Sequence, residues 1–170
     1  RGLGDVYKRQ IDIKAHYRRG APILGICGGY QILGNEIIDD QGYDGTPSKA
    51  KGLGLLNVKT KMGKEKNLGK KEFISTINGK KISGYEIHLG ITSGSDCNNP
   101  FAILGNRKDG AISSNGLVMG TYLHGLFFSD EFRNNFVAKL SSEEKKEDIS
   151  FHDSIESVSY THLRAHETHE

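Results

Sequence analysis

The chain has 170 residues, of which 35% are hydrophobic and 26% charged, and its formal net charge is +2. This length allows one domain with a hydrophobic core, and the near balance of charge predicts neither a nucleic acid nor a membrane as partner. No apolar run approaches the roughly 18 residues of a membrane span. The only cysteines, Cys27 and Cys97, lie far apart and outside any CxxC pattern. We therefore expect no disulfide framework, no metal site and a reducing, cytoplasmic setting.

Both ends of the chain differ in kind from the middle. Residues 1–10, RGLGDVYKRQ, back-translate to the transposon end used to fragment DNA for sequencing, and SVSYTHLRAHET near the other end back-translates to its reverse complement. We therefore expect residues 1–10 and 157–170 to be adapter-derived, and residues 11–156 to be a gene fragment without its natural start or stop. The disfavoured alternative is a basic N-terminal arm and a metal-binding tail, so no ligand role is predicted for His162, His166 and His169.

The first part of the middle segment predicts a helix, a strand and a second helix. Residues 11–19 have a helical pattern that Gly20 ends, and Pro22 opens an apolar run into the sequence GICGG. The amphipathic stretch YQIL follows. A strand, a tight glycine-rich turn and a helix are the parts of a nucleophile elbow, which presents the side chain at its apex to substrate. Cys27 lies at that apex.

A cysteine at the apex of an elbow is suited to nucleophilic catalysis. Free backbone N–H groups and the positive end of the following helix would stabilise the thiolate of Cys27. The N–H of the next residue, Gly28, would point at the oxyanion of a tetrahedral intermediate. The residues leave one alternative open, a buried structural cysteine in a parallel strand followed by a glycine turn.

The segment after the elbow predicts a surface loop, a strand and a hairpin. Residues 39–51 are rich in Gly, Asp, Pro and Ser and predict the loop, whereas residues 54–62 have strand character. The Lys- and Gly-rich residues 63–71 predict a second, solvated loop. Two strand-like runs, residues 73–77 and 81–91, flank an Asn-Gly pair, which is the strongest short-range hairpin signal.

The second arm of this hairpin carries two polar side chains that could serve a site. Strand alternation in the sequence GYEIH places Glu86 and His88 on one face and Tyr85 and Ile87 on the other. The polar face could line a catalytic cleft. It could equally be the solvated side of the hairpin.

The last part of the segment predicts short strands that end at a histidine. Residues 101–105, 111–114 and 117–124 have strand character, with turns at 108–110 and 115–116. His124 ends the last strand just before a glycine, where an imidazole can face a cleft and exchange a proton with a thiol. A helix is predicted from the Ser-Asp-Glu sequence at residue 129 to about residue 140. The loop around Cys97 has no motif, and the charged residues 141–150 suggest a helix end or linker.

Four blocks, in this order, resemble the glutamine amidotransferase domain of cobyric acid synthases: GICGGYQILG, KGLGLL, GYEIHLGIT and DGAISSNGLVMGTYLHGLF. Four ordered blocks are far more specific than any one of them. The resemblance covers roughly residues 11–138. It implies an α/β fold with a flavodoxin-like sheet flanked by helices, truncated at its N-terminus and extended by a β-hairpin region.

The resemblance also implies roles for particular residues. Cys27 matches the nucleophile that forms a glutamyl thioester, His124 its general acid and base, and Gly28 the residue whose N–H lines the oxyanion hole. Related amidotransferases usually carry Pro-Glu after the histidine, where this chain has Gly-Leu. The third catalytic member is therefore unassigned, and the candidates for an orienting or substrate-binding role are Glu86, His88 and Gln31.

The function implied by the resemblance is hydrolysis of glutamine to supply ammonia for amidation of cobyrinic acid a,c-diamide side chains in cobalamin biosynthesis. ATP and Mg²⁺ would act in a synthetase domain outside this chain, and no cofactor is expected within it. We expect the chain alone to lack amidation activity, and its glutaminase activity to suffer from the missing upstream glycine loop. The alternatives are a cobyrinic acid a,c-diamide synthase, a free-standing subunit that amidates lipid II, a cysteine hydrolase with another acyl substrate, and a silent scaffold.

Overall fold

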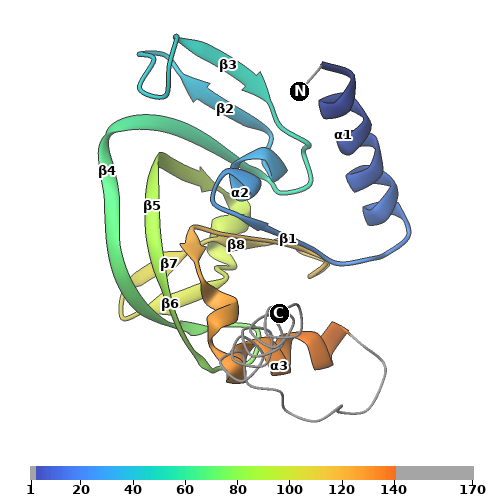
Figure 1. The fold of residues 1–170 in the computed structure, drawn as a ribbon, viewed down its shortest axis with the longest axis vertical. Helices are drawn as coiled ribbons and strands as arrows, with labels where there is room; N and C mark the ends of the chain where they lie inside the picture. The colour runs from blue at the N-terminus through green and yellow to red at the C-terminus, as the bar shows by residue number, and fades with distance from the viewer. Residues whose placement is uncertain (1–2, 141–170) are drawn as a thin grey trace, which may run out of the picture.

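The computed structural model describes residues 3–140 (Figure 1). Its helices are α1 (Leu3–Arg18), α2 (Gly28–Leu33) and α3 (Asp130–Leu140), with 3-10 helices η1 (Ser95–Asn98) and η2 (Leu126–Phe128). Its strands are β1 (Ile23–Ile26), β2 (Glu36–Asp39), β3 (Ser48–Lys51), β4 (Val58–Ser75), β5 (Lys81–Gly94), β6 (Ala102–Leu104), β7 (Arg107–Asp109), β8 (Ala111–Ile112), β9 (Val118–Thr121) and β10 (Leu123–His124).

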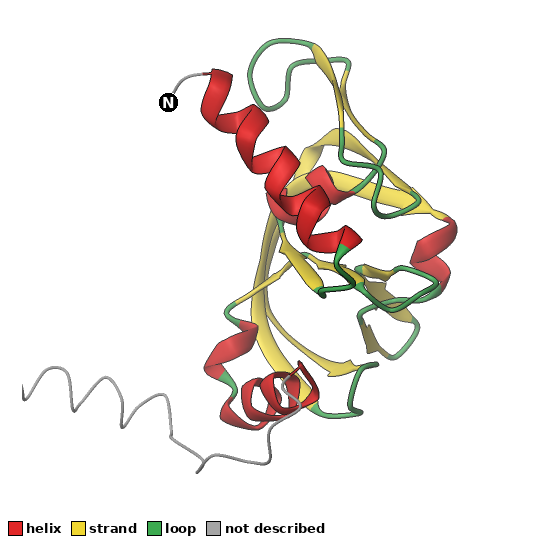
Figure 2. Ribbon diagram, turned by 90° about the vertical axis from the view of Figure 1, so that its right-hand side faces the viewer, coloured by secondary structure: helices red, strands yellow, loops and turns green. Residues whose placement is uncertain are grey.

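The strands are divided between two sheets. The smaller sheet has the order β1-β9-β8, with β1 parallel to β9 and β8 antiparallel to it. The larger sheet has the order β10-β5-β4-β2-β3, and β6 joins it along β4 with β7 beside it. Helices flank these sheets, with α1 and α3 at opposite ends of the molecule (Figure 2). The predicted α/β class is confirmed, and the arrangement is consistent with a flavodoxin-like amidotransferase fold.

The longest feature is the hairpin of β4 and β5, which curves along one side of the molecule (Figure 1). Ile74 pairs with Lys81 at its closed end, and Gly79 has a φ of 69° in the turn. The predicted Asn-Gly hairpin is therefore confirmed. The loop predicted at residues 63–71 is wrong, because β4 runs through that segment with one register shift between Met62 and Asn67. Pairing with β5 outweighs the low intrinsic strand preference of Lys and Gly there.

Two other predicted irregular segments are partly ordered as strands. Within the loop predicted at residues 39–51, β3 pairs antiparallel with β2. Glu36 of β2 forms ion pairs with Lys49 at 3.0 Å and with Lys59 at 3.6 Å. These ion pairs offset the low apolar content of this edge of the sheet. The turn predicted at residues 108–110 is also partly wrong, since β7 pairs with β6 and only Gly110 turns, with a φ of 72°.

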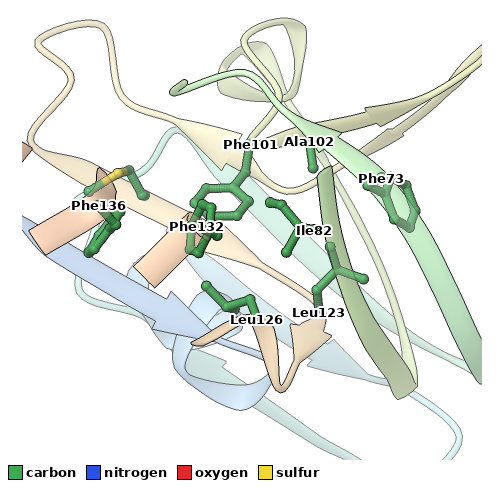
Figure 3. Packing of buried hydrophobic residues seen from close by; sticks show 9 residues of the cluster. Phe73, Ile82, Phe101, Ala102, Leu123, Leu126, Phe132 and Phe136 are labelled. Carbon is green, nitrogen blue, oxygen red and sulfur yellow. The ribbon is translucent and has the colours of Figure 1, made fainter. Parts of the chain in front are cut away.

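The main core lies between the hairpin and α3. The predicted helix beginning near residue 129 is confirmed as α3, and it buries Phe132 and Phe136. Figure 3 shows these rings against side chains from five other elements or their flanks: Phe73, Ile82, Phe101, Leu123 and Leu126. Leu123 precedes His124 directly, so this core anchors the strand that carries the histidine.

A second core packs beneath α2 and includes Tyr30, Leu33, Leu56, Val58 and Val118. The helix predicted at residues 11–19 is present in α1, which begins earlier, at Leu3, and so includes residues that the DNA interpretation assigns to an adapter. Residues 141–150 and 157–170, for which a linker and a second adapter segment were predicted, lie outside the described residues. None of the helices within residues 3–140 is long and apolar enough to cross a membrane.

Candidate active site

Cys27 occupies a sharp turn between β1 and α2. Its φ of 53° and ψ of −112° make it the one non-glycine residue with a positive φ among the described residues. Such a backbone conformation costs about 1–3 kcal/mol, so the surrounding structure must enforce it. The predicted strand, tight turn and helix are thus present, with Cys27 at the apex.

Gly25 makes this turn possible, because α2 packs directly back onto β1. A Cβ atom at Gly25 would lie 2.5 Å from Cδ1 of Leu33 and 2.7 Å from the carbonyl carbon of Gly29. Both distances are shorter than any normal contact. Gly28 is the first residue of α2, so its N–H has no preceding helical turn to bond and remains available at the apex.

β9 and the residues that follow it bring Cys27 and His124 to the same stretch of β5. The N–H of Cys27 donates a 2.8 Å hydrogen bond to the carbonyl of Thr121, the last residue of β9. The chain then enters β10, where His124 pairs with Tyr85 of β5. The thiol of Cys27 donates to the carbonyl of Ile87 at 3.5 Å. Both proposed catalytic residues therefore border the same short stretch of β5.

The imidazole of His124 has an unpaired nitrogen. Nε2 is buried and has no hydrogen-bond partner among the described residues. Buried polar atoms are nearly always paired, so an exception marks an atom that a ligand or a reacting group can satisfy. Gly84 of β5 allows the backbone of His124 to lie close to β5, since a Cβ at Gly84 would lie 2.5 Å from the carbonyl oxygen of His124.

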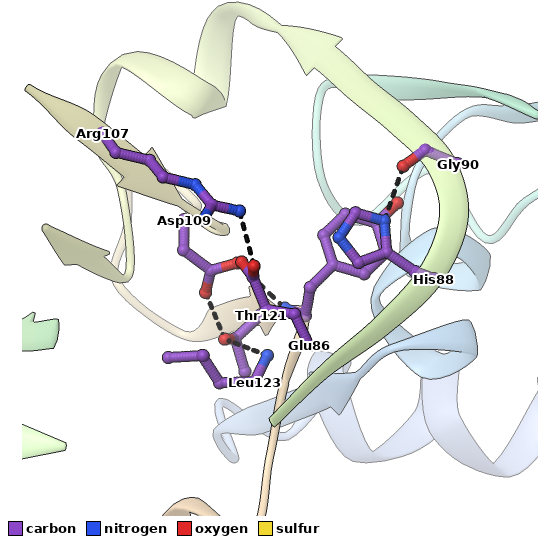
Figure 4. Close-up of polar contacts among 8 residues, drawn as sticks. Glu86, His88, Gly90, Arg107, Asp109, Thr121 and Leu123 are labelled. Atoms are coloured by element: carbon purple, nitrogen blue, oxygen red, sulfur yellow. Dashed lines mark hydrogen bonds and ion pairs between the residues drawn. The ribbon is translucent and has the colours of Figure 1, made fainter. Parts of the chain in front are cut away.

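Glu86 and His88 share the inner face of β5, as the alternation predicts. Glu86 is almost fully buried, whereas Tyr85 and Ile87 are exposed on the outer face. The alternative of a solvated polar face is therefore wrong. Glu86 forms a 2.5 Å ion pair with Nη2 of Arg107. Arg107 thus holds the carboxylate (Figure 4). The carboxylate forms no hydrogen bond with Nε2 of His124.

His88 and Gln31 gather around the ring of Tyr122. The imidazole of His88 stacks on this ring with centroids 3.7 Å apart and planes at 12°, and its Nδ1 is bonded to the carbonyl of Gly90 at 2.7 Å. Burial lowers the pKa of His88, which favours a neutral ring. Gln31 Nε2 donates to the Tyr122 hydroxyl at 3.3 Å. His88 and Gln31 therefore both contact Tyr122 and help to fix the position of its side chain.

The structure adds Asp109, a buried carboxylate that the sequence analysis placed in a turn. It accepts hydrogen bonds from the Thr121 hydroxyl and the N–H of Tyr122. Burial raises the pKa of Asp109 to about 6, against the opposing effect of these hydrogen bonds. The nearby Glu86 raises this pKa further and Arg107 lowers it. Its position directly before Gly110 resembles a turn, and no local signal in the sequence marks its long-range partners.

A polar cavity of about 210 Å³ lies beside this network. Its lining includes both ions of the Glu86–Arg107 pair, together with His88, Asp109 and Tyr122. A cavity with charged groups of both signs can accept a small polar molecule. Among the side chains that the structure describes, no group of three or more His, Cys, Asp or Glu is placed to hold a metal ion.

Comparison with known proteins identifies the type of domain that carries these features. Residues 4–132 match the CobB/CobQ-like glutamine amidotransferase domain. The chain belongs to this amidotransferase family. The resemblance seen in the four sequence blocks is thereby confirmed, and membership makes the chain part of a family of enzymes that take glutamine as substrate.

Several curated relatives of this amidotransferase chain are named cobyric acid synthase. One from Cereibacter sphaeroides is 45% identical over 159 residues, which cover 92% of the chain and 33% of the relative. One from Rhizobium rhizogenes is 50% identical over 129 residues, covering 76% and 27%. One from Allorhizobium ampelinum is 52% identical over 122 residues, covering 72% and 25%. The chain therefore spans about a quarter to a third of the length of these relatives.

Proposed function

We propose that this chain is the glutaminase part of a cobyric acid synthase, in which Cys27 attacks glutamine and His124 transfers protons. The observation that carries the proposal is the elbow of Cys27 at the end of β1, whose N–H bonds the carbonyl of Thr121 at the end of β9, three residues before His124. A strained cysteine and an imidazole with a buried, unpaired nitrogen, both beside the same stretch of β5, are the two groups that thioester chemistry requires.

In the first half of the reaction, the thiol proton of Cys27 passes to His124. In the free protein this proton is directed at the carbonyl of Ile87. The thiolate then attacks the side-chain amide carbon of glutamine, and the N–H of Gly28 stabilises the resulting oxyanion. The C–N bond breaks as His124 returns the proton to the departing nitrogen, which leaves as ammonia. Cys27 then carries a glutamyl thioester.

In the second half, water replaces ammonia. His124 takes a proton from a water molecule as its oxygen attacks the thioester carbon. The C–S bond breaks, glutamate is released and the proton returns to the sulfur of Cys27. One glutamine and one water thus give one glutamate and one ammonia, and the thiol is regenerated.

The ammonia would be used in the part of the longer protein that lies outside this chain. There, ATP with Mg²⁺ would activate the carboxylate side chains of a corrinoid, cobyrinic acid a,c-diamide, for amidation. The shared name of the relatives supports this substrate over the lipid II and non-glutamine hydrolase alternatives. None of these steps involves a cofactor held by the residues of this chain.

Glutamine hydrolysis by the purified chain tests the glutaminase assignment. We expect Cys27→Ser to lower glutamate release by at least about a thousandfold, as for other catalytic nucleophiles. Cys97→Ser is the matched control, because Cys97 is the other cysteine and lies outside the β1–α2 turn, with its thiol 3.7 Å from the hydroxyl of Tyr30. Equal activity of the Cys27→Ser variant and the wild type would refute the assignment. Turnover of p-nitrophenyl esters without turnover of glutamine would instead support a different cysteine hydrolase.

A chimera tests the corrinoid substrate. Residues 11–140 of this chain would replace the matching segment of the Cereibacter sphaeroides relative. We expect glutamine- and ATP-dependent amidation of cobyrinic acid a,c-diamide. Amidation with added ammonia but not with glutamine would refute the glutaminase role, and glutamine hydrolysis without corrinoid amidation would refute the proposed substrate.

A further inference from the structure

The strand that carries His124 changes sheets at one residue. β9 belongs to the small sheet and β10 to the large one, and Tyr122 lies between them. A chain that leaves one sheet for another must find new partners for its backbone groups at the bend. Three polar groups are affected here: the Thr121 hydroxyl and the N–H groups of Tyr122 and Leu123.

Asp109 and Thr121 satisfy all three groups. The carboxylate of Asp109 accepts from the Thr121 hydroxyl through Oδ2 and from the Tyr122 N–H through Oδ1 at 3.2 Å. The Thr121 hydroxyl oxygen in turn accepts from the N–H of Leu123 at 3.0 Å. Figure 4 shows this chain of contacts running from Asp109 through Thr121 to Leu123. It ends one residue before His124.

The same threonine also holds the nucleophile. Its carbonyl accepts the N–H of Cys27, so its backbone faces the elbow while its hydroxyl faces the bend. Both Thr121 and Asp109 are buried, and buried hydrogen bonds to a charged group fix geometry more strongly than exposed ones. Rotation of this side chain would move the start of β10 and with it the imidazole.

We propose that Asp109 and Thr121 are positioning residues that hold His124 at the correct distance and angle from Cys27, an inference that rests on the glutaminase function proposed above. This chain lacks the Pro-Glu sequence after the histidine that orients the imidazole in related amidotransferases. Here the orientation comes from the backbone that precedes the histidine. The Asp109 carboxylate acts through Thr121 and touches neither substrate nor the reacting sulfur.

Charged groups around Asp109 belong to other contacts. Arg107 pairs with Glu86, and His88 stacks on Tyr122 and bonds Gly90. The Asp109 carboxylate receives hydrogen bonds only from the bend among the described contacts of this network. The hydrogen bonds of Asp109 therefore stabilise the backbone conformation of the β9–β10 bend.

Thr121→Val tests the proposal, with Thr121→Ser as its matched control. Valine has nearly the same shape but no hydroxyl, and serine retains the hydroxyl. Because small displacements of catalytic groups are costly, we expect Thr121→Val to lower kcat by about tenfold to a hundredfold and Thr121→Ser by less than about threefold. KM for glutamine should stay unchanged in both. The rates are expressed per active site titrated with 6-diazo-5-oxonorleucine, an electrophilic glutamine analogue, so that unfolded protein is not counted.

Two results would overturn the proposal. One is an unchanged kcat per titrated site in Thr121→Val, which would mean that the hydroxyl contributes only to folding. The other is an equal loss in the serine variant. Should Thr121→Val fail to fold, Asp109→Asn replaces it, because its amide would present a donor to the Thr121 hydroxyl and disturb the same contact.

An NMR measurement separates this inference from the proposed function. The ring resonances of His124 should shift in Thr121→Val and stay in place in Thr121→Ser. Those of His16, which is bonded to the carbonyl of Pro22, should stay in place in both. Absence of glutamine hydrolysis by the chimera described above would overturn the proposed function, and the His124 resonances would still decide the positioning role. Unshifted His124 resonances in Thr121→Val would refute that role.

Discussion

The carbonyl of Thr121 accepts the N–H of Cys27 at 2.8 Å, and the hydroxyl of the same threonine accepts the N–H of Leu123 at 3.0 Å. One buried residue thus bonds both the apex of the elbow and the residue before His124. The two proposed catalytic groups come from segments almost a hundred residues apart in the chain. Their relative position depends on Thr121 together with the contacts that Cys27 and His124 make with β5.

Gly25→Ala should destabilise the protein by about 1–3 kcal/mol or more, the range typical of overpacking. Its Cβ would meet Leu33 and the backbone of Gly29, and neither can move without displacing α2 from β1. Gly29→Ala is the control, since a Cβ at Gly29 meets nothing within 4 Å. Alanine is also the better helix former by roughly 1 kcal/mol. Urea unfolding measures both variants, and equal stability of the two would contradict the packing described.

Arg107→Met should destabilise the protein by about 1–3 kcal/mol, because it leaves the carboxylate of Glu86 buried without its partner. The cost is below that of a fully buried pair, since the Arg107 side chain is 41% exposed and Glu86 only 3%. Lys80→Met is the control. It removes a pair of similar length, 2.6 Å to Glu131, whose side chains are 45% and 59% exposed. We expect that variant to lose less than about 1 kcal/mol.

The double variant Glu86→Gln with Arg107→Met completes this test. Removal of both charges should recover part of the stability lost in Arg107→Met alone, because no unpaired carboxylate is then left buried. Chemical denaturation of all variants at one pH gives the coupling between the two sites. Additive losses would show that Glu86 does not depend on Arg107.

Glu86→Gln by itself should lower kcat for glutamine hydrolysis by less than about tenfold, a loss too small for a residue that acts in the transition state. The reason is that the Glu86 carboxylate is paired with Arg107, and Nε2 of His124 is unpaired. Steady-state kinetics measure the effect. A loss of a hundredfold or more would place Glu86 in the catalytic machinery.

Asp109 predicts a specific dependence of stability on pH. Burial raises its pKa in the folded state from 3.8 to about 6, so the folded state binds its proton more tightly than the unfolded state. The corresponding stabilisation is complete below pH 3.8 and is lost as pH rises through 6. At 1.36 kcal/mol per pKa unit, wild type should lose about 3 kcal/mol relative to Asp109→Asn between these limits.

Unfolding curves of wild type and Asp109→Asn from pH 3.5 to 7.5 check this prediction. His88, whose pKa is lowered by burial, acts in the opposite direction and destabilises the fold as pH falls, but it is present in both proteins. The difference between the two curves therefore isolates Asp109. A difference that does not vary with pH would show that this carboxyl is not shifted.

The elbow and the Asn-Gly hairpin could be predicted because their signals are local. GICGG contains within five residues the small side chains that the turn at Cys27 requires, and an Asn-Gly pair determines its own turn. The middle of β4 could not be predicted, because Lys and Gly there become a strand only through pairing with β5. The composition of a short segment does not indicate which distant strand it will pair with.

The burial of Glu86 and Asp109 could not be predicted for the same reason, because their partners are distant in the chain. Glu86 is buried because Arg107 reaches it from β7, 21 residues away, and Asp109 is buried because the β9–β10 bend supplies donors to it. An Asp-Gly pair on its own indicates a turn. The elbow pattern, the strand end before a glycine and the resemblance to amidotransferases identified Cys27 and His124 as candidates. The contacts that orient them emerge only from the assembled strands.

Detection of a glutamyl thioester on Cys27 is the most direct test of the proposed mechanism. The chain would be mixed with isotopically labelled glutamine, quenched in acid within the first turnover and digested, and the peptides would be weighed by mass spectrometry. We predict label on the peptide containing Cys27, with the mass of glutamine less ammonia, its release by hydroxylamine, and its absence in Cys27→Ser. Glutamine hydrolysis that leaves no label on Cys27, or that persists in Cys27→Ser, would contradict the proposed mechanism.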